Sequence, residues 1–144
     1  MRPEVCADCP VRDDAVCSAL RPDELAELAA IAHHKSFERG ETIFAAGDDS
    51  IACATLISGA AKIVSADEDG VERIVALIHP AGFMGQLVTA ASPFDVIALT
   101  DTRLCLFPRG GFERVMADHP KLIRSILERT QAELDASRTL TSLI

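Results

Sequence analysis

Three of the five cysteines in this 144-residue chain lie within its first seventeen residues, in the spacing Cys-x2-Cys-x7-Cys. They are Cys6, Cys9 and Cys17, and the charged residues between them are costly to bury, so the stretch is not expected to pack as core. Thiolates gathered in this way are typical ligands of soft metals such as iron and zinc. A fourth ligand must come from elsewhere, and the remaining thiols are Cys53 and Cys105.

The composition predicts one globular domain in which these thiols stay reduced. The chain is 49% hydrophobic with a net charge of −8, which disfavours direct binding of nucleic acid by this segment. It has no apolar run of membrane-spanning length, and its first residues lack the apolar core of a signal peptide. We therefore expect a cytoplasmic protein with no membrane partner, and the odd number of cysteines also argues against a disulfide framework.

Short apolar runs separated by turn residues occupy the chain from about residue 35 to 108. Runs this short and this regularly spaced predict a β sandwich or barrel, in its simplest form a jelly roll, or double-stranded β-helix. Helices are expected to flank it, one from Pro22 to His33–His34 and one from Phe112 to about Asp118, after a glycine pair. The predicted fold is mainly β, with strands at Thr42–Ala45, Cys53–Ser58, Ala60–Ser65, Glu72–Ile78, Val96–Leu99 and Thr102–Phe107.

A long helix is predicted to begin at Pro120 and to continue to Ile144 without glycine or proline. Its apolar and small residues alternate four and three apart, which is the spacing of a coiled-coil seam and favours a homodimer through this helix. For the first two turns a wider apolar face also supports packing on the helix's own domain. A further segment is expected after Ile144. The predicted dimer interface is Ile123, Leu127, Thr130, Leu134, Ser137, Thr141 and Ile144.

This order of elements resembles the sensory half of the Crp/Fnr family of transcription regulators, in its cyclic-nucleotide-binding-domain-like fold. The segment Cys6–Cys17, with a proline after its second cysteine and then an arginine, is similar to the oxygen-sensing Fnr branch, in particular its FnrL-like type. The resemblance implies a 4Fe–4S cluster held by Cys6, Cys9, Cys17 and Cys105, which air-exposed protein can lack. It divides the chain into a cluster-binding loop (1–20), a sensory roll (21–119) and a dimerisation helix (120–144).

The residues themselves support iron over zinc, because a structural zinc site more often shows two Cys-x2-Cys knuckles and this chain has one. They separate the two candidate fourth ligands only slightly. Cys53 has small apolar neighbours and fits a buried hydrophobe, whereas Cys105 shares its strand face with Arg103 and Phe107. The resemblance adds the larger part of the preference for Cys105.

Three alternative functions compete with a cluster-binding sensor. One is a structural zinc module for dimerisation, with four cysteine ligands. Another is a nucleotide-binding roll like that of the catabolite activator, but Gln86 replaces its acid and Pro93-Phe94-Asp95 its Arg-Ser pair, so a phosphate would meet an aspartate and no cyclic nucleotide is expected. The third, a cupin-like metalloenzyme, would need a histidine cluster, and His79 is the only histidine from residue 35 to 108. No enzyme activity is expected.

The resulting hypothesis is an oxygen-sensing module. The resemblance implies that the intact cluster favours the dimer, that oxygen destroys the cluster, and that a helix-turn-helix domain after Ile144 then releases DNA. DNA and RNA polymerase are thus expected partners of the full-length protein only. Because Cys6–Cys17 has little apolar content, we expect ligation to order it.

Overall fold

The structure of the chain is a computed structural model, and it describes residues 9, 14–49, 51–87 and 91–142, with side chains to residue 139. One short 3₁₀ helix, η1, precedes the remaining elements, and a long helix ends the described chain. The elements in order are η1 Val16–Ala19, α2 Pro22–Ile31, β1 His33–Phe37, β2 Thr42–Phe44, β3 Ala52–Ser58, β4 Ala61–Ala66, β5 Glu72–Ile78, β6 Phe83–Met84, β7 Asp95–Ala98, β8 Thr102–Pro108, α3 Arg109–Asp118 and α4 Pro120–Ser142.

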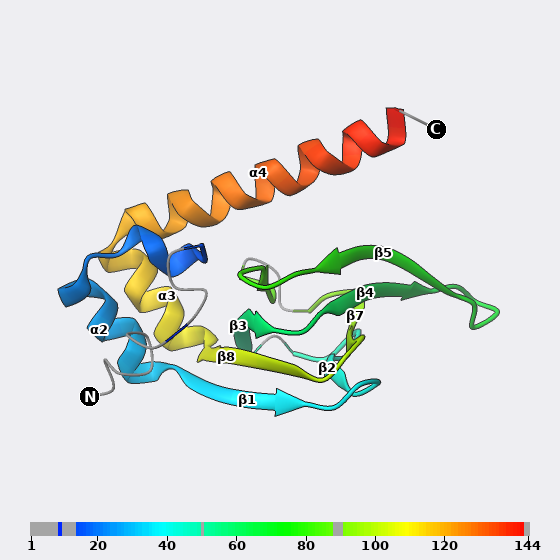
Figure 1. The fold of residues 1–144 in the computed structure, drawn as a ribbon, viewed down its shortest axis with the longest axis horizontal. Coiled ribbons are helices and arrows are strands. Elements are labelled where there is room, and N and C mark those ends of the chain that lie inside the picture. The colour runs from blue at the N-terminus through cyan, green and yellow to red at the C-terminus, as the bar shows by residue number, and fades with distance from the viewer. Residues whose placement is uncertain (1–8, 10–13, 50, 88–90, 143–144) are drawn as a thin grey trace.

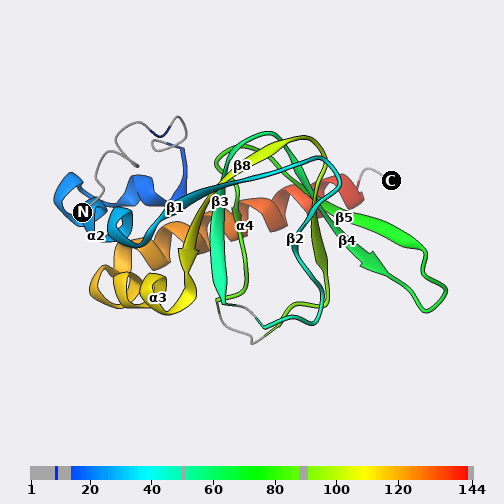
Figure 2. The same cartoon turned by 90° about the horizontal axis from the view of Figure 1, so that it is seen from below.

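The strands form two antiparallel sheets, in the orders β1-β8-β3-β6 and β2-β7-β4-β5. Each sheet joins strands that are distant in the chain, and this arrangement confirms the predicted jelly roll. Figure 2 shows the β4–β5 hairpin projecting from the roll on the side opposite to α2 and α3. The helices thus gather at one end of the roll.

The first sheet separates two apolar cores, because successive side chains of a strand point to opposite faces. One face meets the second sheet, and we call this packing the inter-sheet core. The other face meets the helices, and we call it the helix-side core. The inter-sheet core consists of Phe37, Ala54, Leu56, Ala61, Ile78, Met84, Val96, Ala98 and Leu104. The helix-side core consists of Ala15, Val16, Cys17, Leu20, Leu25, Leu28, Ala29, Cys53, Ile57, Ala81, Cys105, Phe107, Phe112, Val115 and Leu122.

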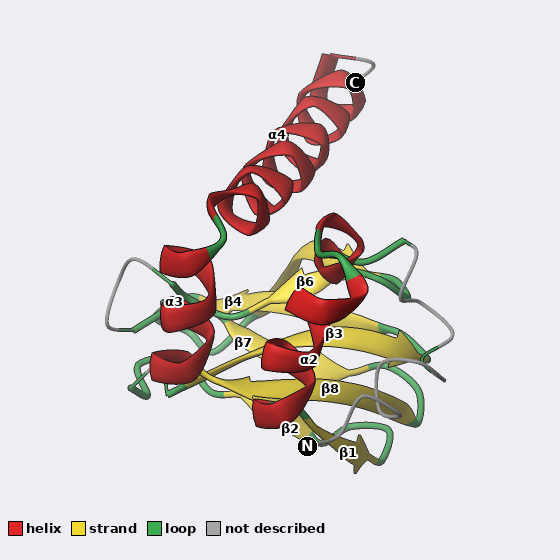
Figure 3. Cartoon of the chain, turned by 90° about the vertical axis from the view of Figure 1, so that its left-hand side faces the viewer, coloured by secondary structure: helices red, strands yellow, loops and turns green. Residues whose placement is uncertain are grey.

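Helices α2 and α3 cover the helix-side core, as Figure 3 shows in front of the strands. Phe112 of α3 is fully buried, and its ring centroid lies 5.2 Å from that of Phe107 on β8 and 5.5 Å from that of Phe83. Leu28 of α2 and Leu122 of α4 are fully buried in the same core. Three helices are therefore anchored to one face of one sheet.

The beginning of the roll differs from the prediction. The first helix ends at Ile31, and β1 begins at His33, where the sequence pattern predicted the end of a helix. Strand β1 lies at the edge of its sheet and only its last residue, Phe37, is buried, so its sequence carries no apolar alternation. The two-residue strand β6, Phe83–Met84, was missed because it is too short to show a period.

Helix α3 begins at Arg109, so it includes the glycine pair that was expected to precede it. Gly111 is buried against α2, where a β-carbon would lie 3.0 Å from Cδ1 of Ile31. The glycine therefore permits the close approach of two helices. This packing benefit is not visible in a local sequence pattern, in which glycine predicts the end of a helix.

The expectation that the cysteine loop is unpacked is wrong for its second half. Ala15, Val16, Cys17 and Leu20 are all buried at the helix-side core, with Val16 fully inaccessible. The charged residues that argued against packing lie before this stretch. Four side chains of this short segment are enough to pack η1 on the roll.

Helix α4 begins at Pro120, as predicted, and then leaves the roll. Leu122 is fully buried and Ile126 packs partly against the helix-side core, which confirms packing on the domain over the first two turns. Every side chain from Gln131 to Thr139 is exposed. Figure 1 shows the helix extending away from α2 and α3 towards the C-terminus. Within the described part of the chain, no helix is long and apolar enough to cross a membrane.

Candidate metal centre

Cys105 lies near the middle of β8, on the face that the helices cover. It is 6% exposed and stands between two strands: its pairing partner on β3 is Thr55 and its pairing partner on β1 is His34. Directly paired side chains of antiparallel strands point to the same face and have β-carbons about 4.5–5.5 Å apart. Both neighbours therefore contribute to the immediate surroundings of the Cys105 thiol.

Two cysteines of the N-terminal stretch reach the same core. Cys17, in η1, is 9% exposed, and Cys9 is half-buried and packs against the helix-side core. The fold thus brings three of the four predicted ligands to one face of one sheet, although 88 residues separate Cys17 from Cys105. The fourth, Cys6, lies outside the described residues. Among those described, no group of three or more His, Cys, Asp or Glu side chains is placed to hold a metal ion.

Cys53 lies in the same core, but the environment of its thiol is different. It is fully buried, its thiol donates to the Phe107 carbonyl oxygen over 3.9 Å, and burial raises its pKa to about 12. The backbone of Gly85 closes over it with φ +117°, where a β-carbon would lie 2.8 Å from Cα of Cys53. A thiol that stays protonated and enclosed by backbone is a poor metal ligand, because the thiolate is the ligand.

The donor set around Cys105 suits an iron–sulfur centre. Thiolates are its usual ligands, and hydrogen bonds to its sulfur atoms adjust its reduction potential. Thr55 Oγ1 and His34 Nε2 are buried polar atoms that have no hydrogen-bond partner among the described residues. Buried polar groups are normally satisfied, so both atoms are available to bond to an acceptor placed in this region.

Helix η1 is tied directly to α4. Ser125 Oγ donates to the Val16 carbonyl oxygen over 3.3 Å, and the Arg129 guanidinium donates to the Asp14 carbonyl oxygen. Both acceptors belong to the segment that carries Cys17. The segment that carries Cys17 is therefore bonded to α4 within the first three turns of that helix.

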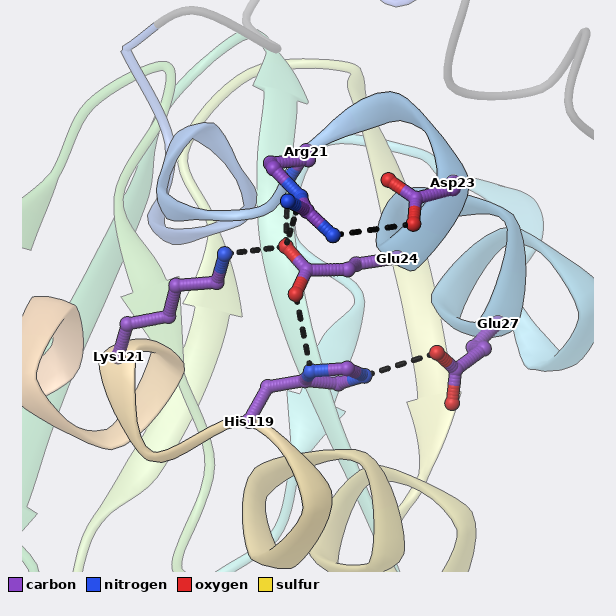
Figure 4. Close-up of polar contacts among 6 residues, drawn as sticks. All are labelled: Arg21, Asp23, Glu24, Glu27, His119 and Lys121. Atoms are coloured by element: carbon purple, nitrogen blue, oxygen red, sulfur yellow. Dashed lines mark hydrogen bonds and ion pairs between the residues drawn. The ribbon is translucent and has the colours of Figure 1, made fainter.

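A polar cluster fixes the corner between α2 and α4 (Figure 4). Glu24 accepts from the backbone N–H of Arg21 over 2.8 Å, pairs with Lys121, and lies 3.2 Å from Nδ1 of His119. His119 also contacts Glu27, with 2.8 Å between Nε2 and Oε2. The cluster joins the start of α2 to the start of α4 and so fixes the two helix ends relative to each other.

We expect Glu24→Gln to lower the free energy of unfolding at neutral pH. The hydrogen bond from Lys121 and the backbone N–H of Arg21 lower the pKa of Glu24 from 4.5 to about 2. The depressed pKa means that the carboxylate stabilises the folded state above pH 4.5, and that this contribution is lost as the pH falls from 4.5 towards 2. Urea unfolding of both proteins across this window measures the effect, with Glu68→Gln in the exposed hairpin turn as control. If the difference in unfolding free energy between the wild type and Glu24→Gln stays constant down to the folded-state pKa of Glu24, the lowered pKa is contradicted.

Comparison with known proteins identifies the fold. Residues 34–119 match the cyclic nucleotide-binding domain family. The chain belongs to this family. It is 37% identical over 133 residues to the transcriptional activator protein FnrL of Cereibacter sphaeroides, covering 92% of the chain and 54% of FnrL. It is 30% identical to the nitrogen fixation regulation protein FixK of Bradyrhizobium diazoefficiens, covering 92% and 56%. These relatives place it in the Crp/Fnr branch, as the resemblance predicted.

Solved structures show the same fold. The sensor domain of the transcriptional regulator DNR from Pseudomonas aeruginosa superposes with a TM-score of 0.77 at 21% identity, covering 92% of this chain and 90% of that one. The chain spans about half the length of the curated relatives named above. Those relatives are regulators, so the prediction that this cyclic nucleotide-binding domain is not an enzyme is confirmed.

A cavity of about 370 Å³ lies in the roll, and its lining includes Gly85, Gln86 and Ser92. Among the described residues, Asp48, Asp49 and Lys35 are the charged side chains that line it, and Phe94 lines it as well. No arginine is among its described lining residues. Asp95, expected to repel a phosphate, instead accepts the backbone N–H of Ala46 over 2.6 Å and so has a structural role.

The predicted dimer seam faces solvent where it is described. Leu127 is 63% exposed, and Ile123 and Leu134 are 41% and 43% exposed. Thr130 and Ser137 are exposed as well, whereas Thr141 and Ile144 lie outside the described side chains. Solvent-exposed leucines in one helical stripe are typical of a surface that a partner covers.

Proposed function

We propose that this chain is the oxygen-sensing domain of a Crp/Fnr-type transcription regulator, in which Cys6, Cys9, Cys17 and Cys105 hold a 4Fe–4S cluster. One observation carries the proposal: the buried core that contains Cys105 and Cys17 and receives Cys9 also contains Leu122 of α4. The cysteines and the proposed dimer helix therefore share one packing unit. We infer that a displacement of the cysteines also displaces the start of α4.

The cysteines would respond to oxygen by holding or releasing the N-terminal segment that contains η1. When bound, the cluster supplies a covalent, oxygen-labile link between the N-terminal thiolates and β8. Cys105 is fixed by the strand ladder. In contrast, η1 is a four-residue helix held by a small apolar patch and by two hydrogen bonds from α4, one to Val16 within it and one to Asp14 before it. Without that link, these are the contacts that hold η1 among the described residues, and the helix is expected to open more often.

The residues on the output side are those of the α4 seam. Two copies of α4 would bury Ile123, Leu127 and Leu134 against each other in a parallel coiled coil. The direction of α4 is set near its start by Leu122, Ser125 and Arg129, which touch the cysteine-bearing segment or its core. We infer that the intact cluster, with η1 held against the roll, keeps α4 in the direction that allows two copies to pair. DNA and RNA polymerase would then be engaged by the full-length dimer.

Arg129→Gln is expected to weaken the coupling between cluster loss and dimer dissociation. The arginine is the outermost contact between α4 and the segment before Cys17, and its loss leaves the Asp14 carbonyl oxygen without that donor. The variant should bind iron normally, but its dimer fraction should respond severalfold less to cluster loss than that of the wild type. Arg124→Gln, a change at an exposed position earlier in the same helix, is the control. An unchanged response in Arg129→Gln argues against this route.

The metal decides between the proposal and a structural zinc module. Protein purified without oxygen should contain iron and acid-labile sulfide in equal amounts and show the broad visible absorbance of a cluster. Stoichiometric zinc without sulfide would replace the sensor by a dimerisation module. We also infer that the cavity of the roll takes no cyclic nucleotide, since the charged residues among its described lining are two aspartates and one lysine. A thermal shift with millimolar cyclic AMP tests that inference and should show no stabilisation.

A further inference from the structure

Two buried hydrogen-bonding groups flank Cys105 without a partner of their own. Thr55 is 2% exposed and lies directly opposite Cys105 on β3, and its hydroxyl oxygen has no partner among the described residues. His34 lies directly opposite Cys105 on β1, and its Nε2 is likewise buried and unpartnered there. Paired residues share a face, so both groups lie on the same side of the sheet as Cys105. That side faces the helix-side core, to which Cys17 belongs and against which Cys9 packs.

The contact with Arg103 settles which nitrogen of His34 carries a proton. The guanidinium Nη2 of Arg103 lies 2.9 Å from Nδ1 of His34. A guanidinium only donates hydrogen bonds, so Nδ1 accepts and the proton of the neutral ring is on Nε2. The unpartnered atom is therefore an N–H donor. Thr55 adds a hydroxyl donor on the other side of Cys105.

A buried donor without an acceptor destabilises a protein, and two on either side of one cysteine point to a shared acceptor. The acceptor must be able to sit over β8 among thiolates. Sulfur atoms of a metal centre meet this requirement, because both thiolate and bridging sulfide accept hydrogen bonds.

We propose that Thr55 and His34 are positioning residues that donate hydrogen bonds to sulfur at the Cys105 corner of the cluster. This inference rests on the proposed function. The two donors would hold the Cys105 thiolate in one orientation and draw charge from the sulfur, which raises the reduction potential. Their effect should appear only when the cluster is bound, and this separates them from residues that merely support the fold.

The same strand provides a matched control. Thr102 is 4% exposed, and its hydroxyl oxygen is also buried without a partner among the described residues. It lies three residues before Cys105 and therefore on the opposite face of β8, and its pairing partner Phe37 belongs to the inter-sheet core. Thr102→Val thus removes the same kind of group at the same depth, away from the cysteines.

The experiment compares Thr55→Val and Thr102→Val in metal-free and in anaerobically reconstituted protein. In metal-free protein both variants should melt at or above the wild-type temperature, because each loses an unpartnered hydroxyl. In loaded protein only Thr55→Val should release iron to a chelator faster, by about tenfold, and show a more negative reduction potential. His34→Phe should shift both properties in the same direction.

Three results would overturn the inference: equal iron release in the two threonine variants, an unchanged potential in Thr55→Val, or a lower melting temperature of metal-free Thr55→Val. The last would show that the hydroxyl is bonded within the metal-free protein. Failure of the proposed function is distinguishable, because it would appear as iron that persists after Cys105→Ser. Wild-type iron binding that needs Cys105, but is indifferent to Thr55, refutes this inference alone.

Discussion

Cys105→Ser is expected to leave anaerobically purified protein with almost no iron or sulfide, while its fold persists. Serine has nearly the shape of cysteine, so the strand ladder around position 105 should be kept, but its hydroxyl is not a ligand that iron–sulfur clusters normally use. Iron analysis and visible absorbance measure the loss. Far-ultraviolet circular dichroism should show an unchanged roll.

Cys53→Ala provides the matched comparison. Cys53 lies on the same sheet face as Cys105 and is more deeply buried, but its thiol is engaged with a carbonyl oxygen and its pKa is about 12. We expect this variant to retain its iron and to lose only a little stability, since removing one buried sulfur leaves a small cavity. Iron that follows Cys53 and survives Cys105→Ser would reverse the assignment of the fourth ligand.

Leu127→Lys is expected to make the cluster-loaded protein monomeric. The leucine is 63% exposed in the single chain and is assigned to the dimer seam. Burying a leucine contributes about 1.5–3 kcal/mol, and a symmetric dimer contains the substitution twice, so the dimer should weaken at least about a hundredfold. Analytical ultracentrifugation of anaerobic samples measures the dissociation constant.

Ala132→Lys is the control for this change. Ala132 is exposed on the same helix, five residues further along, and in the heptad spacing it lies on the outer face. It introduces the same charge without touching the seam, so the dimer should be as stable as that of the wild type. Equal weakening by both variants would indicate that charge, not the seam, governs association.

The sequence was sufficient for the features that depend on local chemistry. The alternation of short apolar runs predicted the roll, and Pro120 marked the start of α4. The four-three spacing predicted a stripe on α4 that the structure finds exposed at Leu127 and Leu134. These signals are periodic or involve residues with special backbone properties, so they can be detected without knowing the tertiary fold.

Features that depend on distant contacts were not predictable. Strand β1 is polar because one side of it is an edge, and only its pairing with β8 reveals it. Val16 is buried in a core to which α4 contributes, and its bonded partner Ser125 on that helix is 109 residues away. His34 and Thr55 stand beside Cys105 only because of the register of three strands. The same register places Cys53 and Cys105 on one face, so orientation alone could not choose between them.

The coupling between cluster and dimer is tested most directly by one titration. Anaerobic, cluster-loaded protein is exposed to air in steps, and its iron content and its molar mass by light scattering are measured on the same samples. The account predicts that the dimer fraction falls in proportion to the cluster and returns when the cluster is rebuilt. An oligomeric state that stays the same while the cluster is lost would contradict it.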